Sequence, residues 1–217
     1  MKTAIIVPIK TNNQRLPGKN TRLLNGKHLY RYLFETLKKC DTVDSIYIDS
    51  SDNTILDIAK EWGFKVIKRP VRLDSPDTSG YDLLNFELPF IEEDIVCQVF
   101  VTLPFIKSKT ITESIKFLQE SETADSVLNL YPMYDRFWYQ RIPVNHDPNS
   151  LVGTQYMDPI LREAGFYVFK KDVFLREQKR VTSKFVEFIV DPDECIDIDT
   201  MQDFIYAEAY EKWRQNN

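Results

Sequence analysis

The sequence predicts an α/β fold in which a mainly parallel β-sheet carries helices on both faces. Two observations support this prediction: short apolar runs alternate with amphipathic segments over the first 131 residues, and the alternation resumes after a long irregular stretch. Such alternation is typical of strands joined by helical crossovers. The chain has 217 residues, of which 43% are hydrophobic, and this is enough for one core. We therefore expect residues 1–217 to form a single domain.

Strands and helices are expected to follow one another in a regular order. The short apolar runs predict buried strands at 3–9, 45–51, 64–70, 94–102 and 124–131. Apolar residues at helical spacing predict helices at 29–40, 51–63, 77–91 and 108–121. Ligands of such sheets bind beyond the carboxyl ends of the strands, so the loop after the first strand is a candidate binding region.

The stretch 131–158 interrupts this order. It is rich in proline and aromatic residues and has no helical periodicity, which is typical of a functional loop. We expect an irregular arm here that serves as a lid, a substrate loop or a dimer contact. The α/β pattern resumes at 164–174 and 183–191, and a final helix is expected from Thr200 to about Arg214.

The charge and composition exclude some classes of partner. Lys and Arg number 28 against 33 Asp and Glu, which gives a net charge of −5. A general nucleic-acid binder needs clustered excess positive charge, so any anion site must be local. No apolar run approaches the roughly 18 residues of a membrane-spanning helix, and Cys40, Cys97 and Cys195 are widely spaced. We expect a cytoplasmic protein with buried thiols and no membrane or nucleic-acid partner.

The loop at 11–29 concentrates cations and turn residues directly after the first strand. Within it, the sequence Pro17, Gly18, Lys19, Asn20 predicts a turn that exposes backbone N–H groups beside a lysine, and Arg15 stands nearby. Backbone donors together with a cation suit the oxygens of a triphosphate. The spacing is not that of a P-loop, because no glycine stands five positions before Gly18. The alternative is an ordinary solvated loop.

The segment 196–200, with the sequence IDIDT, places two carboxylates close together. On an extended strand Asp197 and Asp199 share one face, while Ile196 and Ile198 face the core. Adjacent carboxylates repel each other unless a cation lies between them, and a hard divalent ion such as Mg2+ resolves this conflict. The alternative is a helix cap, in which Asp199 or Thr200 begins the last helix and Asp197 is solvated.

These segments resemble the acylneuraminate and 3-deoxy-manno-octulosonate cytidylyltransferases. The stretch IIVPIKTNNQRLPGKN (5–20) is similar, without a gap, to the family's apolar strand, Pro–Ala–Arg, small-residue loop and Leu–Pro–Gly–Lys–Asn. CIDIDTMQDFIYAE (195–208) resembles the family's C-terminal signature, and the likeness covers nearly the whole chain. The resemblance implies a Rossmann-like, GT-A-like nucleotidyltransferase fold and a homodimer. It also implies an enzyme that transfers CMP from CTP to a small acidic acceptor and releases pyrophosphate, with Mg2+ as its cofactor.

The resemblance assigns residues to each part of such a site. It implies CTP contacts from Pro8, Lys10, Asn12, Asn13, Lys19, Asn20 and Ser79. It implies Mg2+ ligands at Asp197 and Asp199. The departing pyrophosphate would be stabilised by Lys19, together with Lys10 or Arg15. Positioned charges, and not a nucleophilic side chain, would then carry the catalysis.

The middle third departs from the family pattern, so the acceptor is less defined. The family's arginine after Pro–Ala is Lys10 here, and Asn12 and Asn13 replace small residues. The arginine that suits a sugar carboxylate is missing from the segment around Gln155. We expect acceptor contacts from Thr102, Arg136, Arg141 and Gln155, with Arg162 as a further candidate for a carboxylate or phosphonate clamp. The resemblance implies an acceptor that is an ulosonic or nonulosonic acid sugar of cell-surface polysaccharide synthesis, or a phosphonate.

Two other functions fit parts of the pattern. A GT-A-type glycosyltransferase shares the strand–helix alternation and paired aspartates, although its Asp-x-Asp normally follows a central strand. A non-catalytic nucleotide sensor would account for Lys10, Asn12 and Asn13 at positions where the family has other residues. Pyrophosphate release from CTP in the presence of an acid acceptor distinguishes the transferase from both alternatives.

Overall fold

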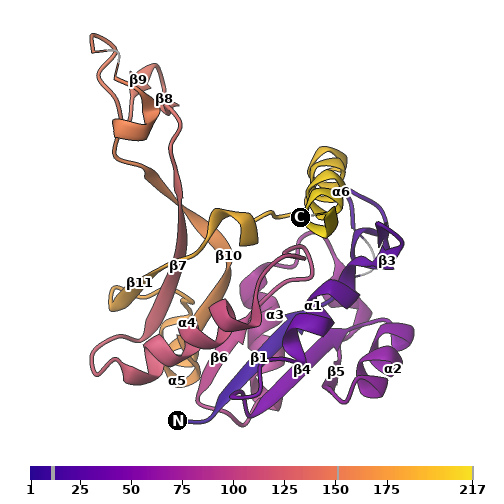
Figure 1. Ribbon diagram of the computed structural model, residues 1–217. Coiled ribbons are helices and arrows are strands. Elements are labelled where there is room, and N and C mark those ends of the chain that lie inside the picture. The colour runs from indigo at the N-terminus through magenta and orange to yellow at the C-terminus, as the bar shows by residue number, and fades with distance from the viewer. Residues whose placement is uncertain (11–12, 151, 217) are drawn as a thin grey trace.

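The computed structural model describes residues 1–10, 13–150 and 152–216 and confirms the predicted α/β architecture. Within these residues a seven-stranded sheet has the order β11-β7-β10-β6-β1-β4-β5 (Figure 1). Its strands are β1 (Thr3–Pro8), β4 (Ser45–Ser50), β5 (Lys65–Lys68), β6 (Ile95–Gln98), β7 (Ser126–Met133), β10 (Ile160–Lys170) and β11 (Phe185–Ile189). The strands predicted before residue 131 are present, but β6 ends at Gln98 and not at Thr102.

Most neighbouring strands run parallel. β6, β1, β4 and β5 pair in parallel, which places their carboxyl ends along one edge of the sheet. β10 runs antiparallel to β6 and β7, and β11 joins the outer edge parallel to β7. Strand β1 is buried on both faces, which is why apolar residues follow one another without a break from Ala4 to Pro8. The loop after β1 therefore lies at the same edge as the loops after β4, β5 and β6.

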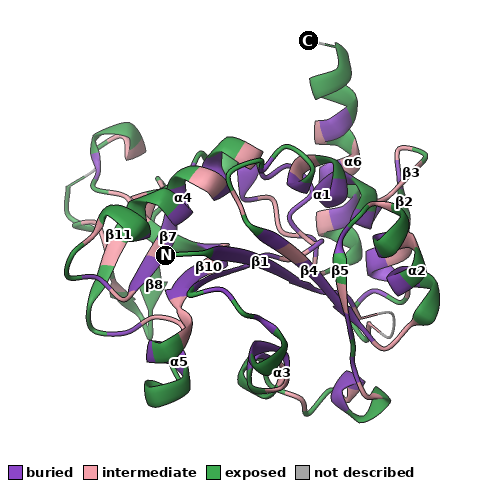
Figure 2. Cartoon of the chain, turned by 90° about the horizontal axis from the view of Figure 1, so that it is seen from below, coloured by how far each residue is buried: buried purple, intermediate pink, exposed green. Residues whose placement is uncertain are grey.

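Helices cover both faces of the sheet, as predicted (Figure 2). A large apolar cluster packs α1 (Leu29–Leu37), α2 (Asn53–Glu61) and α4 (Ser108–Glu120) on one face. A smaller cluster packs α3 (Gly80–Glu87) and α5 (Lys171–Glu177) on the other face. Cys40, Cys97 and Cys195 are buried and free, as expected. None of the helices in the described ranges has the length and hydropathy that crossing a membrane requires.

A third apolar cluster joins the two ends of the chain. The C-terminal helix α6 (Met201–Asn216) packs on the hairpin of β2 (Leu23–Leu24) and β3 (Lys27–His28). This cluster consists of Leu16, Leu24, Leu29, Tyr32, Phe105, Ile198, Phe204 and Ala207. Burial of these side chains holds the segment before α6 against the first loop, although the two are far apart in the sequence.

The segment 195–199 is not the extended strand that its alternation predicted. It lies beside the loop after β6, where the Ile198 N–H donates to the Thr102 carbonyl (2.9 Å), and it joins no strand ladder among the described residues. The predicted orientation is nevertheless correct. Ile198 is buried in the third apolar cluster and Ile196 packs against it, whereas Asp197 and Asp199 are half-buried and do not belong to that cluster.

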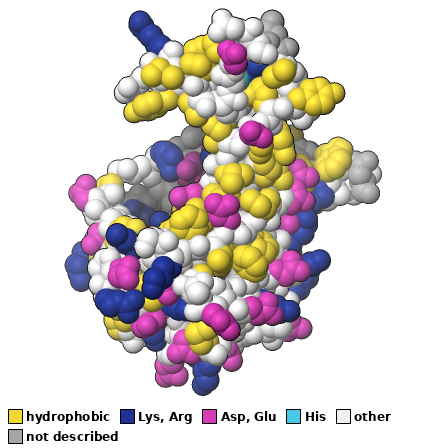
Figure 3. All heavy atoms as spheres, turned by 90° about the vertical axis from the view of Figure 1, so that its left-hand side faces the viewer, with side chains coloured by type: hydrophobic (Ala, Val, Ile, Leu, Met, Phe, Trp, Pro, Cys, Tyr) yellow, Lys and Arg dark blue, Asp and Glu magenta, His cyan; other side chains and the backbone are white. Residues whose placement is uncertain are grey.

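Residues 131–158 project from the sheet as an arm that is more regular than predicted (Figure 1). β7 and β10 continue beyond the sheet as an antiparallel pair in which Ile160 opposes Met133. A hairpin of β8 (Trp138–Tyr139) and β9 (Ile142–Pro143) lies near the tip. A ribbon exposed on both faces needs no alternation of apolar and polar residues, which is why the strands left no periodic signal. Exposed hydrophobic side chains, among them Tyr139 and Ile142, gather on this arm (Figure 3).

Candidate functional site

A cavity of about 230 Å³ lies at the carboxyl ends of β1 and β6. It is lined by Pro8, Lys10, Asn13, Lys19, Asn20, Arg69, Leu83, Phe100, Val101, Thr102 and Asp199. A second cavity of about 200 Å³ shares Lys10, Asn13, Lys19 and Asp199 with it and continues along Gln14, Arg15, Leu16 and Pro76. The structure thus brings together the first loop, the loop after β6 and the segment before α6, as the prediction of a nucleotide site requires.

The first loop and the C-terminal segment meet in a cluster of charges. Lys19 Nζ lies 2.8 Å from Asp199 Oδ1, and Arg15 Nη2 lies 2.8 Å from Asp199 Oδ2. Gly18 adopts a φ of 66°, a left-handed conformation that favours glycine, and this turn leads directly into the short 3-10 helix that holds Lys19. The Lys19 side chain is 10% exposed and that of Asp199 33%. Two cations from the first loop therefore stand at the cavity, held by one carboxylate.

Other first-loop side chains leave hydrogen-bonding atoms without partners. Asn20 Nδ2 donates to the Lys10 carbonyl (2.6 Å), and Lys10 Nζ donates to the Ser75 carbonyl (3.2 Å). Asn20 Oδ1 and Asn13 Oδ1 are buried and have no hydrogen-bond partner among the described residues. Buried polar atoms are normally paired, so unpaired acceptors in the lining of a cavity are suited to a ligand that donates hydrogen bonds. Asn12 lies outside the described residues.

Asp197 and Asp199 fit a magnesium ion that also binds substrate phosphates. Burial raises the pKa of Asp197, the Thr102 side chain lowers it by hydrogen bonding, and nearby Asp199 raises it again. Asp199 lines both cavities and Asp197 lines neither, but Asp197 Oδ1 is buried without a hydrogen-bond partner among the described residues and could therefore serve as a ligand. No group of three or more His, Cys, Asp or Glu side chains in the described ranges is arranged to hold a metal. Mg2+ often takes only one or two carboxylates and completes its shell with water and phosphate oxygens.

The predicted acceptor residues divide into two groups. Thr102 lines the cavity, and Arg162 is close enough to Asp197 to lower the pKa of that carboxyl. The remaining residues belong to the arm: Arg136 donates to the Val152 carbonyl (2.6 Å), Arg141 follows β8, and Gln155 lies in the short 3-10 helix Thr154–Tyr156. None of these three is among the residues that line the cavity.

Ser79 does not line the cavity either. Its hydroxyl accepts a hydrogen bond from the Asp82 N–H (3.1 Å), and the Asp82 carboxylate accepts one from the Ser79 N–H (2.9 Å). This reciprocal capping box begins α3 and occupies the side chain. In this conformation Ser79 stabilises a helix terminus beside the site and does not contribute a cavity-lining group.

Arg69 is a site residue that the sequence analysis missed. It lines the cavity although it is only 1% exposed, and its guanidinium donates to Asp49 Oδ2 (2.9 Å) and to the Ile9 carbonyl (3.0 Å). Arg69 Nε has no hydrogen-bond partner within the described ranges. The local signal was weak: an arginine that precedes Pro70 at the end of a predicted strand.

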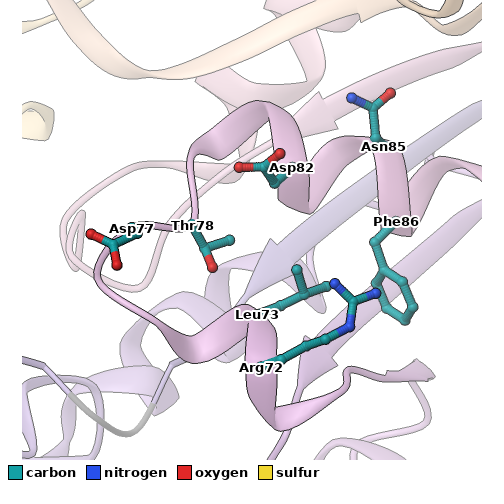
Figure 4. Close-up of a pocket in the computed structure, with 7 residues that line it drawn as sticks. All are labelled: Arg72, Leu73, Asp77, Thr78, Asp82, Asn85 and Phe86. Carbon is teal, nitrogen blue, oxygen red and sulfur yellow. The ribbon is translucent and has the colours of Figure 1, made fainter.

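A larger cavity of about 540 Å³ lies elsewhere, between α3 and the segment after β5 (Figure 4). Its lining residues are Arg72, Leu73, Asp77, Thr78, Asp82, Asn85 and Phe86. With two carboxylates and one guanidinium, this lining does not attract a triphosphate. The smaller cavity at the strand ends is therefore the better candidate for a nucleotide site.

Residues 4–214 match the sequence profile that describes cytidylyltransferases. The chain belongs to the cytidylyltransferase family. This membership confirms the resemblance inferred from the first loop and the IDIDT segment. N-acylneuraminate cytidylyltransferase A of Danio rerio is 22% identical over 212 residues, which cover 94% of this chain and 49% of that protein. The chain thus spans about half the length of that relative.

Further similarities extend to an octulosonate enzyme and to solved structures. The 8-amino-3,8-dideoxy-manno-octulosonate cytidylyltransferase of Shewanella frigidimarina is 25% identical over 197 residues, 79% of this chain and 76% of that protein. A CMP:2-keto-3-deoxy-manno-octonic acid synthetase complexed with CTP has a TM-score of 0.74 at 16% identity, covering 99% of this chain and 100% of that one. A 4-diphosphocytidyl-2C-methyl-D-erythritol synthase from Anaerococcus prevotii has a TM-score of 0.69 at 14% identity, covering 97% and 96%. These two structures share the fold.

Proposed function

We propose that the chain is a Mg2+-dependent cytidylyltransferase that transfers CMP from CTP to a small acidic acceptor and releases pyrophosphate. One observation carries the proposal: Lys19 of the first loop and Asp199 of the C-terminal segment lie 2.8 Å apart at a cavity beyond the strand ends. Family membership and relatives named for N-acylneuraminate and octulosonate acceptors support the same conclusion.

The triphosphate binds along the first loop. Lys19, Arg15 and Lys10 provide three cations there, and the first two pair with Asp199. When CTP enters, its phosphate oxygens accept hydrogen bonds from these cations, which then stabilise the charge on the leaving pyrophosphate. Asp199 is released from two partners at once and becomes available to a cation. Asp197 and Asp199 would hold Mg2+, which would supply charge neutralisation at the reacting phosphate.

The base is recognised by the unpaired atoms of the cavity. Cytosine carries acceptors at O2 and N3 and an amino donor at N4. Arg69 Nε supplies a donor and Asn20 Oδ1 an acceptor, both buried and without partners in the described part of the chain. Asn13 Oδ1 offers a second acceptor for the amino group or the ribose. Pro8 completes the floor of the cavity.

The acceptor approaches from the side of Thr102 and Arg162. A hydroxyl oxygen of an acid sugar, or an anionic oxygen of a phosphonate, attacks the α-phosphorus of CTP and forms the new P–O bond. The bond from the α-phosphorus to the oxygen that bridges the α- and β-phosphates breaks, pyrophosphate leaves with that oxygen, and the proton of an attacking hydroxyl passes to water. Arg162 lies near Asp197 and provides a bidentate donor for the carboxylate of an acid sugar or for a phosphonate. Arg136, Arg141 and Gln155 belong to the arm, so they would reach an acceptor either where the arm of one chain contacts the site of another in a homodimer or where the arm closes over its own site.

Pyrophosphate release tests the proposal. The wild-type protein is incubated with CTP, Mg2+ and, in separate reactions, ulosonic acids, nonulosonic acids and phosphonates. Pyrophosphate formed in step with one CMP-linked acceptor supports the proposal and identifies the acceptor class. Binding of CTP without turnover of any acceptor would favour a nucleotide sensor, and turnover of a sugar nucleotide would favour a glycosyltransferase. The molar mass measured by light scattering during size-exclusion chromatography, at several protein concentrations, tests whether the protein is a homodimer.

A further inference from the structure

Four charged side chains lie together in the wall beneath the cavity. Asp49 is near the end of β4, Arg69 follows β5, Asp74 is in the 3-10 helix after it, and Glu87 is the last residue of α3. Asp49 and Glu87 are 0% exposed, Arg69 1% and Asp74 9%. Ionised groups are seldom buried so completely unless they are paired. We call these four residues the wall cluster.

Arg69 is the centre of the wall cluster. Its Nη1 lies 2.9 Å from Asp49 Oδ2, and its Nη2 lies 3.0 Å from Asp74 Oδ1 and donates to the Ile9 carbonyl (3.0 Å). The Ile9 N–H in turn donates to the Asp49 carbonyl (2.7 Å). The start of the first loop is therefore tied to the same groups that orient the Arg69 guanidinium. Arg69 Nε is the atom that these contacts leave unpaired in the described residues.

One guanidinium faces three carboxyl groups in the wall cluster, so full ionisation is unfavourable. Burial, followed by the charge of Asp49, raises the pKa of Glu87 well above its usual range. Burial raises the pKa of Asp49 as well, whereas Arg69 and a hydrogen bond from Glu87 lower it. These directions place the proton on Glu87, whose hydroxyl then donates to Asp49. In the structure both Glu87 oxygens and Asp49 Oδ1 are buried without a hydrogen-bond partner in the described ranges, and a proton held between the two carboxyl groups would pair them.

The position of Glu87 on its helix argues against a purely space-filling role. Leu84, one turn earlier on α3, and Leu88, directly after Glu87, are both buried. They belong to the smaller apolar cluster, which packs α3 and α5 on the sheet. A leucine at position 87 would avoid the cost of desolvating a carboxyl group. What a leucine lacks is a hydrogen-bond donor for the second oxygen of Asp49.

We propose that Glu87, in its protonated form, is a positioning residue for nucleotide binding: it fixes Asp49, and through Asp49 it holds Arg69 against the cavity. The inference rests on the proposed function, because it assigns Arg69 Nε to the nucleotide. Glu87 itself does not touch the nucleotide. Its loss affects the binding of CTP more than the chemical step, since the triphosphate contacts of Lys19 and Arg15 come from a different segment.

Steady-state kinetics of three variants test this role. Glu87→Gln keeps a neutral donor, Glu87→Met keeps the volume but removes the donor, and Leu88→Ala weakens the adjacent apolar packing without touching the wall cluster. We expect the KM for CTP to rise about tenfold in Glu87→Met, with kcat changed less than twofold. Glu87→Gln and Leu88→Ala should keep the KM of the wild type within about twofold. Calorimetric titration with CTP and Mg2+ should show the same order of affinities.

The outcomes separate the two proposals. A wild type that neither binds CTP nor releases pyrophosphate would overturn the proposed function and this inference together. A wild type that turns over CTP while Glu87→Met keeps its KM would overturn the inference alone. An equal rise of KM in Leu88→Ala would also overturn the inference, because a general loosening of the cavity wall would then explain the rise. A KM for Glu87→Gln as high as that of Glu87→Met would overturn it as well, because the donor would then not matter.

A pH profile keeps the inference testable if Glu87→Met does not fold. As pH rises and Glu87 loses its proton, its carboxylate repels Asp49, so the KM for CTP in the wild type should rise. Glu87→Gln cannot lose that proton and should lack this part of the profile. The charged groups that act on Glu87, Asp49 and Arg69, are common to both proteins, and so is Asp74, which acts on Asp49. Identical profiles would contradict the role assigned to Glu87.

Discussion

Two charged clusters lie on different walls of one cavity, and they differ in how much water reaches them. The rim cluster consists of Arg15, Asp199 and Lys19, whose side chains are 67%, 33% and 10% exposed. In the wall cluster, Arg69 and Asp49 are 1% and 0% exposed. Solvated ion pairs exchange partners at little cost, whereas a buried pair is expensive to break. The rim is therefore suited to binding and releasing a charged substrate, and the wall cluster is suited to holding a fixed shape.

The sharpest test of this difference is the removal of the wall cation. Arg69→Met leaves Asp49 and Asp74 buried without their partner, so we expect a loss of about 3–5 kcal/mol in the free energy of unfolding. Urea denaturation measures the loss. Arg72→Met, at the exposed arginine three residues later, is the matched control and should change stability by less than about 0.5 kcal/mol. Equal stability of the two variants would show that the wall cluster does not hold the fold.

Removal of the divalent ion should slow catalysis at the rim cluster and leave the stability of the fold unchanged. Chelation with EDTA is expected to lower pyrophosphate release about a thousandfold, or ~4 kcal/mol in the barrier, because charge on the reacting phosphate loses its neutralisation. The melting temperature without nucleotide should not change, since Asp199 is already paired with Lys19 and Arg15. Replenishing Mg2+ should restore the rate. Undiminished turnover in EDTA would rule out a role for the metal.

Removal of the rim lysine should reduce catalysis and affect stability only slightly. Lys19→Met is expected to lower kcat about 10²–10³-fold, the usual effect of deleting one group that stabilises developing charge. The free energy of unfolding should fall by less than about 1 kcal/mol, because Arg15 still pairs with Asp199. Lys116→Met, on the exposed side of α4, is the control. A large loss of stability with little loss of rate would reverse the distinction between rim and wall.

The rim cluster is predictable from the sequence and the wall cluster is not, for a physical reason. Lys19 and Asp199 stand in short local patterns, a turn and an alternating run, whose residue types reveal their chemistry. Asp49, Arg69 and Glu87 come from three separate elements, and only tertiary packing brings them together. No local pattern distinguishes a buried glutamate that keeps its proton from an exposed glutamate on a helix.

Competing local signals explain the other differences. The strand and helix order was predictable because burial on the sheet imposes periodicity, and the fold is confirmed by its relatives. The arm was predicted as irregular because its exposed ribbon needs no periodicity. Ser79 was assigned to the nucleotide, yet Ser79 and Asp82 stand at capping-box spacing, and in the structure they cap α3. The strand predicted at 196–200 is not formed. Its alternation of isoleucine and aspartate reflects packing of the isoleucines against the first loop and not a place in the sheet.

The smallest expected effect is a difference in the pH dependence of stability between the wild type and Glu87→Gln. The folded state keeps a proton on Glu87 at pH values where the unfolded chain has lost it, since burial raises the pKa from its ordinary value of 4.5. Unfolding then releases a proton, so the stability of the wild type falls as pH rises from 4.5 toward the raised value. The expected slope is up to about 1.4 kcal/mol per pH unit. Glu87→Gln has no such proton and should show a flatter curve in urea denaturation. Parallel curves for the two proteins would mean that Glu87 is ionised in the folded state and that the wall cluster is more solvated than its burial indicates.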